Sequence, residues 1–140
     1  MDRKSILQRF GLNSDNSVVI GSGILEAIGV RKSHDIDLVV LPKVFNFLKD
    51  SGKFALSYAH GREVLSGASL EISASWYVLG EKYYFKDLIG ESIVIDGVRY
   101  ITVDFLYKVK KSWFEEGSAR PKDIKDIKLI EKYFARGRDG

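Results

Sequence analysis

Apolar residues change their spacing several times in the first third of the chain, and each change predicts a new element. Helical spacing ahead of Gly11 predicts a short amphipathic helix, and an unbroken apolar run ending at Gly21 predicts a buried strand. Pro42 favours the first turn of a further helix. In chain order, the pattern predicts a helix over 3–10, a strand over 18–20, a helix over 24–28, a strand over 36–41 and a helix over 42–52.

The remainder of the chain is expected to form antiparallel strands followed by two helices. Alternating apolar residues over 54–75 predict strands that extend the sheet, and Asp96-Gly97 between apolar runs suits a two-residue hairpin. Helical spacing returns over 103–113 and again over 121–134. We therefore expect one α/β (α+β) domain over residues 1–140. It should have a mixed, mostly antiparallel central sheet flanked by helices and a C-terminal helical pair within 102–136.

Composition narrows the class of protein without revealing its chemistry. The chain has 140 residues, of which 45% are hydrophobic and 29% are charged, as in one globular domain with a modest core. Its net charge of +3 is too small to indicate nucleic-acid binding by itself. The absence of cysteine excludes disulfides and thiolate metal sites, so oxygen ligands are favoured for any metal. With no membrane span or secretory apolar segment in the sequence, we expect a cytoplasmic protein that does not enter a membrane.

The strongest chemical signal is a small turn followed by two spaced carboxylates. Gly21-Ser22-Gly23 comes after the strand at 18–20 and opens a helix, where backbone N–H groups attract phosphate oxygens. Asp35-Ile36-Asp37 is flanked by apolar residues, and side chains two apart on a strand point to one face. Both carboxylates could therefore share a divalent cation. Taken singly, the turn could be an ordinary strand-to-helix connection and the acids could be solvated at a strand edge.

Together these residues resemble the nucleotidyltransferase superfamily related to polymerase beta. The resemblance is to its small prokaryotic members and to the nucleotidyltransferase toxins of abortive-infection systems. It rests on Gly21-Ser22 and on the string from Arg31 to Asp37. A second match comprises Val98–Ile101, a helix bearing Lys110, and Arg120-Pro121-Lys122-Asp123 with Asp126.

The resemblance implies site residues and a cofactor. Asp35 and Asp37 would bind two magnesium ions with a third carboxylate, for which Glu71 between Leu70 and Ile72 is the candidate. Glu71 would also be a candidate base. Alternatively, Glu71 could be an ordinary strand residue that faces solvent. Gly21 and Ser22 would contact the triphosphate. Lys110 and Arg120 would supply positive charge to it, although such basic runs are also typical of a solvated helix face.

The remaining histidines, acids and aromatic residues are expected to have structural and not catalytic roles. His34 is expected in a solvated loop, and His60 and Arg62 in a surface turn. Asp123 and Asp126 are expected to cap and pair within the last helix rather than bind metal. The aromatic-rich stretch over 76–85 is expected to pack in the core or an interface rather than to stack on a base.

The resulting hypothesis is an enzyme that binds ATP or another NTP and transfers its nucleoside monophosphate to an acceptor, releasing pyrophosphate. The acceptor is left open among RNA, protein and a small molecule. One alternative is a catalytically inactive nucleotide-binding domain or partner subunit, and a homodimer is compatible with the small size. Another is a nucleic-acid-binding domain that uses the basic residues over 108–122.

Overall fold

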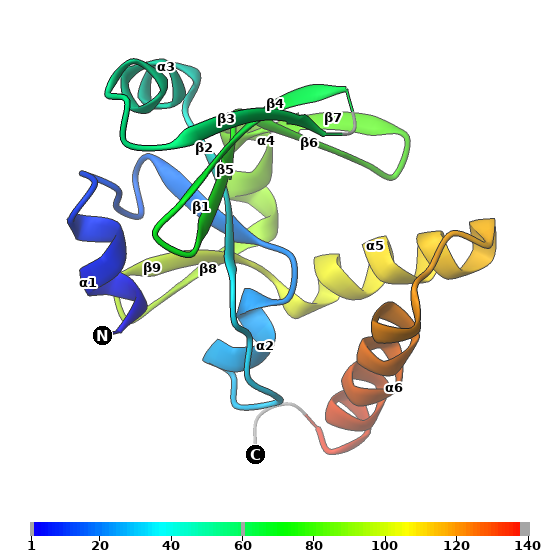
Figure 1. Ribbon diagram of the computed structural model, residues 1–140. Helices are drawn as coiled ribbons and strands as arrows, with labels where there is room; N and C mark the ends of the chain where they lie inside the picture. The colour runs from blue at the N-terminus through cyan, green and yellow to red at the C-terminus, as the bar shows by residue number, and fades with distance from the viewer. Residues whose placement is uncertain (1, 60, 138–140) are drawn as a thin grey trace.

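The structure is a computed structural model, and it describes residues 2–59 and 61–137. Its elements follow the predicted order over most of the chain (Figure 1). They are α1 (Arg3–Gln8), β1 (Ser17–Ile20), α2 (Gly23–Ala27), β2 (Ile36–Val40), α3 (Pro42–Asp50), β3 (Ala55–Ala59), β4 (Arg62–Gly67), β5 (Leu70–Ser73), β6 (Ser75–Val78), β7 (Glu81–Tyr84), α4 (Phe85–Leu88), η1 (Ile89–Glu91), β8 (Ser92–Ile95), β9 (Val98–Ile101), α5 (Val103–Glu116) and α6 (Pro121–Ala135).

A seven-stranded sheet forms the centre of the fold, in the order β3-β4-β5-β2-β1-β9-β8. The pairs β2–β5 and β1–β9 are parallel, while the other four pairs are antiparallel. The expected mixed and mostly antiparallel sheet is therefore confirmed. So is the C-terminal helical pair, which projects from one side of the sheet as a V in Figure 1.

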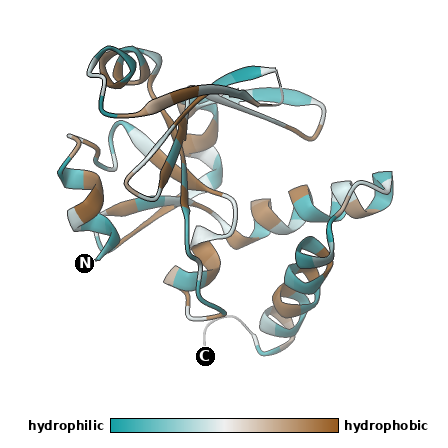
Figure 2. Cartoon of the chain, in the orientation of Figure 1, coloured by the Kyte–Doolittle hydropathy of each residue, from teal (hydrophilic) through white to brown (hydrophobic). Residues whose placement is uncertain are grey.

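The core sits around the central strands, because these are the most continuously apolar segments. All four residues of β1 are buried, and Leu38 on β2 and Ile72 on β5 are almost fully enclosed. Figure 2 shows hydrophobic residues concentrated in these strands, whereas α6 alternates between hydrophobic and hydrophilic positions. The inner face of α6 packs on α5, where the rings of Tyr107 and Phe134 meet edge to face with centroids 5.4 Å apart. No helix in the described part of the chain is long and apolar enough to span a membrane.

Local turn chemistry explains several boundaries. Asp96 and Gly97 both have positive φ, 50° and 79°, as the tight hairpin between β8 and β9 requires. Pro42 stands at the first turn of α3 as expected. Thr102 caps α5 by accepting a hydrogen bond from the backbone N–H of Phe105 at 3.1 Å.

Two parts of the sheet differ from the sequence expectation. Period-two spacing over 54–75 predicted strands near β3 and β5 but not β4 between them, and β3 proves to be an exposed edge strand. The aromatic-rich stretch forms a separate two-stranded hairpin, β6–β7, and α4. Trp76 and Phe85 are buried as expected, but Tyr77 is exposed. Alternation marks a half-buried strand, so it is weak where both faces of a strand meet solvent.

Candidate functional site

The turn between β1 and α2 lies directly against the second acid of the Asp-Ile-Asp motif. Ile20, the last residue of β1, is the register partner of Asp37 on β2. Gly21 has a φ of +67°, and a Cβ placed on it would lie 3.2 Å from Oδ2 of Asp37. The left-handed backbone favours glycine, and a Cβ at this position would press on the Asp37 carboxylate. The turn and the carboxylate therefore form one site.

A second carboxylate stands beside Asp37. Glu71 on β5 is its register partner across a parallel strand pair, so the two side chains leave the same face of the sheet. Glu71 is solvent-exposed between the buried Leu70 and Ile72. Asp35 precedes β2 in a bend and is exposed, so it is not a strand residue as the alternation suggested. The motif therefore places Asp37 within the sheet and leaves Asp35 just before the first residue of β2.

The environment of Asp37 disfavours its negative charge. Partial burial, the charge of Glu71, a hydrogen bond between the two carboxyl groups and the charge of Asp35 together raise the pKa of Asp37 to about 6. Lys122 at the start of α6 acts in the opposite direction. A group with these neighbours is stabilised by any cation that reaches it. Perturbed pKa values of this kind are concentrated at functional sites.

Arg62 contributes a cation to the same face of the sheet. It begins β4 instead of lying in a surface turn, and its Nε donates to Oγ of Ser73 at 3.1 Å. Burial lowers the pKa of the Arg62 guanidinium, and the charges of Asp37 and Glu71 partly offset that effect. His60, two positions earlier in the sequence, lies outside the described residues.

Lys110 is enclosed by carboxylates and does not face open space. Its side chain is only 4% exposed, and its Nζ lies 2.7 Å from Oδ1 of Asp123 and 3.3 Å from Oδ2 of Asp126. The two acids therefore form ion pairs, as expected, but with a partner on α5 and not only within the last helix. The structure thus pairs Lys110 with two acids of α6 and joins α5 to α6 through it, whereas the resemblance placed its charge near the triphosphate.

Asp126 links this buried pair to the turn. It receives Nε and Nη2 of Arg31 at 2.6 and 2.8 Å, and Oγ of Ser22 donates to it at 3.1 Å. Burial by itself would raise the pKa of Asp126, but the hydrogen bonds from Arg31 and Ser22 and the charges of Lys110 and Arg31 outweigh it and lower the pKa. The Ser22 hydroxyl is therefore directed toward α6.

Arg120 lies at the N-terminal boundary of α6 with a largely exposed side chain. Its Nε lies 3.2 Å from Oδ2 of Asp123, and its backbone N–H donates to the same oxygen at 3.0 Å. Burial opposes the charge of Asp123, but hydrogen bonds from Lys110 and Arg120 lower its pKa. The helix start is thus held by an acid whose charged form is favoured.

The donor set suits a hard divalent cation, although the side chains are not gathered around a common point. Within residues 2–59 and 61–137, no three His, Asp or Glu side chains form a ready-made metal site. Asp37 and Glu71 nevertheless present carboxylate oxygens side by side, with Asp35 two residues away. Carboxylate oxygen is the donor that Mg²⁺ prefers, so these residues fit magnesium chemically.

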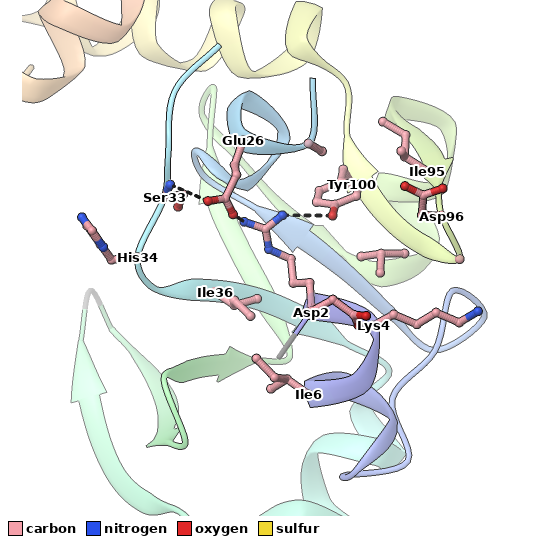
Figure 3. Close-up of a pocket in the computed structure, with 14 residues that line it drawn as sticks. Asp2, Lys4, Ile6, Glu26, Ser33, His34, Ile36, Ile95, Asp96 and Tyr100 are labelled. Atoms are coloured by element: carbon pink, nitrogen blue, oxygen red, sulfur yellow. Dashed lines mark hydrogen bonds and ion pairs between the residues drawn. The ribbon is translucent and has the colours of Figure 1, made fainter. Parts of the chain in front are cut away.

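A separate cavity of about 880 Å³ lies between α1, α2 and the β8–β9 hairpin (Figure 3). Arg3 crosses it, donating to the hydroxyl of Tyr100 at 3.1 Å and pairing with Glu26. Ile36, whose side chain leaves β2 on the face opposite to Asp37, forms part of its wall. Neither Asp37 nor Glu71 lines the cavity. It is distinct from the carboxylate site, and its central charges already pair with each other.

Sequence reasoning favoured a surface turn for Arg62 and placed Lys122 only within a basic run, so it put neither beside the two carboxylates. Arg62 could have been found from the alternation over 62–66, which places it on the same face as Val64 and Ser66. Lys122 stands in the Arg120–Asp123 string, but only the packing of α6 brings its charge to Asp37. Local spacing could thus have indicated Arg62, whereas Lys122 depends on tertiary packing.

Comparison with known proteins gives structural neighbours only. No family model and no curated protein sequence matches the chain. Among solved structures it is similar to ANT(2″)-Ia, an aminoglycoside nucleotidyltransferase solved in complex with adenylyl-2″-tobramycin, with a TM-score of 0.58 and 14% identity over 96% of this chain and 87% of that one. It is also similar to a Thermotoga maritima protein assigned as a nucleotidyltransferase, with a TM-score of 0.52 and 17% identity over 95% of this chain and 90% of the other. The chain therefore has the nucleotidyltransferase fold.

Proposed function

We propose that the protein transfers a nucleoside monophosphate from an NTP to an acceptor hydroxyl and releases pyrophosphate. One observation carries the proposal: Asp37 and Glu71 stand side by side on neighbouring parallel strands, with an oxygen of Asp37 against the turn at Gly21. The unfavourable charge of Asp37 is what a site for a cationic or metal-bound substrate requires. The nucleotidyltransferase fold supports the same reading.

Each residue then has a distinct task. Backbone N–H groups of the turn at Gly21 and Ser22 approach the phosphates, while Arg62 and Lys122 neutralise part of their charge. The acceptor oxygen bonds to the α-phosphorus as the bond to the pyrophosphate oxygen breaks. Glu71, the exposed acid of the pair, accepts the proton of the acceptor hydroxyl.

Magnesium is the cofactor that this donor set favours. Asp37 and Glu71 would hold the ion, with Asp35 as a third carboxylate. When bound, magnesium would neutralise phosphate charge and activate the attacking oxygen. Lys110, Asp126 and Arg120 do not touch the substrate in this proposal. They fix the position of α6 relative to the turn.

The similar ANT(2″)-Ia suggests one acceptor chemistry to test. Its structure contains tobramycin carrying an adenylyl group at the 2″ position, and that statement concerns that protein. For this chain we propose ATP among the NTP substrates and a hydroxyl as the accepting group.

A transfer assay provides the test. The protein is incubated with each α-phosphate-labelled NTP, magnesium and candidate acceptors, and compared with Asp37→Asn and with Asp50→Asn, an exposed acid at the end of α3. Label should move to an acceptor with the wild type and Asp50→Asn, and not with Asp37→Asn. Transfer that is unaffected by Asp37→Asn would contradict the proposal.

A nucleotide-binding domain without turnover is the second candidate. The observation in its favour is that the described carboxylates do not gather three ligands, because Asp35 lies outside β2. Calorimetric titration with magnesium and NTP separates the two. Binding that depends on Asp37 without any label transfer supports this candidate over the enzyme.

A further inference from the structure

The solvent face of α6 carries a continuous row of positive charge. Its five members, four lysines of α6 and the arginine that follows its last residue, are all exposed and are spaced three or four residues apart: Lys122, Lys125, Lys128, Lys132 and Arg136. At 3.6 residues per turn this spacing keeps them on one side of the helix, over about 21 Å of its length. We call these residues the basic row.

The acids of α6 are directed elsewhere. Asp123 and Asp126 are buried in ion pairs with other side chains, and Glu131 accepts a hydrogen bond from the hydroxyl of Tyr107 at 2.7 Å. No member of the basic row forms an ion pair within the part of the chain that the structure describes. The row therefore concentrates more positive charge than the net +3 of the whole chain.

One end of the row adjoins the carboxylate site. Lys122 stands one helical turn before Asp126, and Asp126 binds the hydroxyl of Ser22 in the turn that contacts Asp37. From that end the row leads away along α6 toward Arg136. A ligand lying on it would therefore have one end beside the reacting groups.

The chemistry of the row selects the kind of ligand. Protein partners bind through a core of apolar and aromatic side chains, whereas the row itself consists only of cations. Interfaces with nucleic acid are more polar and far more positive, and lysines at regular intervals suit a chain of phosphates. A strand of nucleic acid matches this surface better than an acidic protein does.

We propose that the acceptor is the end of a single-stranded nucleic acid, whose phosphates lie along the basic row and whose terminal hydroxyl reaches Glu71. The terminal oxygen bonds to the α-phosphorus of the NTP, the bond to pyrophosphate breaks, and Glu71 takes the hydroxyl proton. The strand grows by one nucleotide. This inference rests on the proposed function, because it names the acceptor of that reaction.

Strand binding is measured by fluorescence anisotropy with a short fluorescein-labelled RNA and a DNA of the same sequence, each with a free 3′ hydroxyl, over a range of salt concentrations. The test variant is Lys125→Gln/Lys128→Gln/Lys132→Gln. Its matched control is Lys43→Gln/Lys53→Gln/Lys82→Gln, which removes the same charge from exposed positions on other elements. Because each phosphate contact adds about 0.7 to the salt slope for a single strand, the test variant should lose about 2 from the slope and about 10- to 100-fold in affinity. The control should match the wild type.

Magnesium and NTP binding, followed in parallel by calorimetry, should be equal in the wild type and both triple variants. Equal strand affinity in the test variant and its control would overturn the inference while leaving the proposed function intact. Competition by polyglutamate as effective as by unlabelled strand would also overturn it, in favour of an acidic protein. If the wild type does not bind NTP, the proposed function is overturned, whatever the strand affinities.

Discussion

Neutralising Asp37 should stabilise the protein as it removes the proposed activity. The pKa of this carboxyl is raised from 3.8 to about 6 by partial burial, by Glu71 and by Asp35. A shift of about 2 units corresponds to about 3 kcal/mol of penalty on the charged form. Because the side chain is only partly buried and solvent screens the acids around it, we expect about 1–2 kcal/mol. Asp37→Asn should raise the free energy of unfolding at pH 8 by that amount.

The sign of the pH dependence follows from the raised pKa. The pKa of Asp37 is higher in the folded protein than in the unfolded chain, so the folded state is favoured most below pH 3.8, where the carboxyl is protonated in both states. This contribution to stability is lost as pH rises through about 6. Urea unfolding of the wild type, Asp37→Asn and Asp50→Asn should be compared between pH 4 and pH 8. The advantage of Asp37→Asn over the wild type should grow across this range and level off above about pH 6, while Asp50→Asn should show no such trend. An advantage that is constant with pH, or that shrinks, would refute the assigned environment.

Magnesium should offset the unfavourable negative charge of Asp37 in the folded protein. At pH 8 the ion should raise the melting temperature of the wild type and leave that of Asp37→Asn unchanged, because binding to the folded state alone stabilises it. Addition of EDTA should reverse the shift. An equal magnesium effect on both proteins would place the ion elsewhere.

Three further substitutions test the scaffold around the site. Gly21→Ala forces a side chain into a left-handed backbone position against Asp37, so magnesium and NTP affinity, measured by calorimetry, should fall at least about 10-fold while the helical circular dichroism signal persists. Gly23→Ala places a methyl group on Cγ1 of the buried Val19, and urea unfolding should show a loss of about 1–3 kcal/mol. Lys110→Met leaves the buried Asp126 with one cation fewer, and the same measurement should show a loss of about 3 kcal/mol.

The sequence was most informative where one local signal decides the structure. The Asp96-Gly97 pair predicted the β8–β9 hairpin, and the unbroken apolar run before Gly21 predicted β1. Both depend on backbone preference or burial over a few residues. The parallel pairing of β2 with β5 was beyond such signals, because nothing local joins strands that are distant in the chain.

The same limit applies to the candidate site. Glu71 was identified because an acid between two apolar strand residues must face away from them, and it is the register partner of Asp37. Its role as a metal ligand stays a prediction. Lys110 was expected near phosphate because its charge and position in the chain suggested it, yet the fold encloses it between Asp123 and Asp126. Residue type does not reveal whether a charge has partners within the protein.

The contrast between two aspartates separates scaffold from site. Asp126 and Asp37 both lose solvent in the fold, but Asp126 receives Arg31, Ser22 and Lys110 and has a lowered pKa, whereas Asp37 meets mainly other carboxylates and has a raised one. A structural acid is expected to acquire enough partners to hold its charge, since an uncompensated charge costs stability. An acid that keeps its unfavourable neighbours needs a partner from outside the chain, and two acids whose pKa values move apart have different roles. On this argument Asp126 fixes the turn and α6, and we propose that the positive charge that pairs with Asp37 arrives with the substrate.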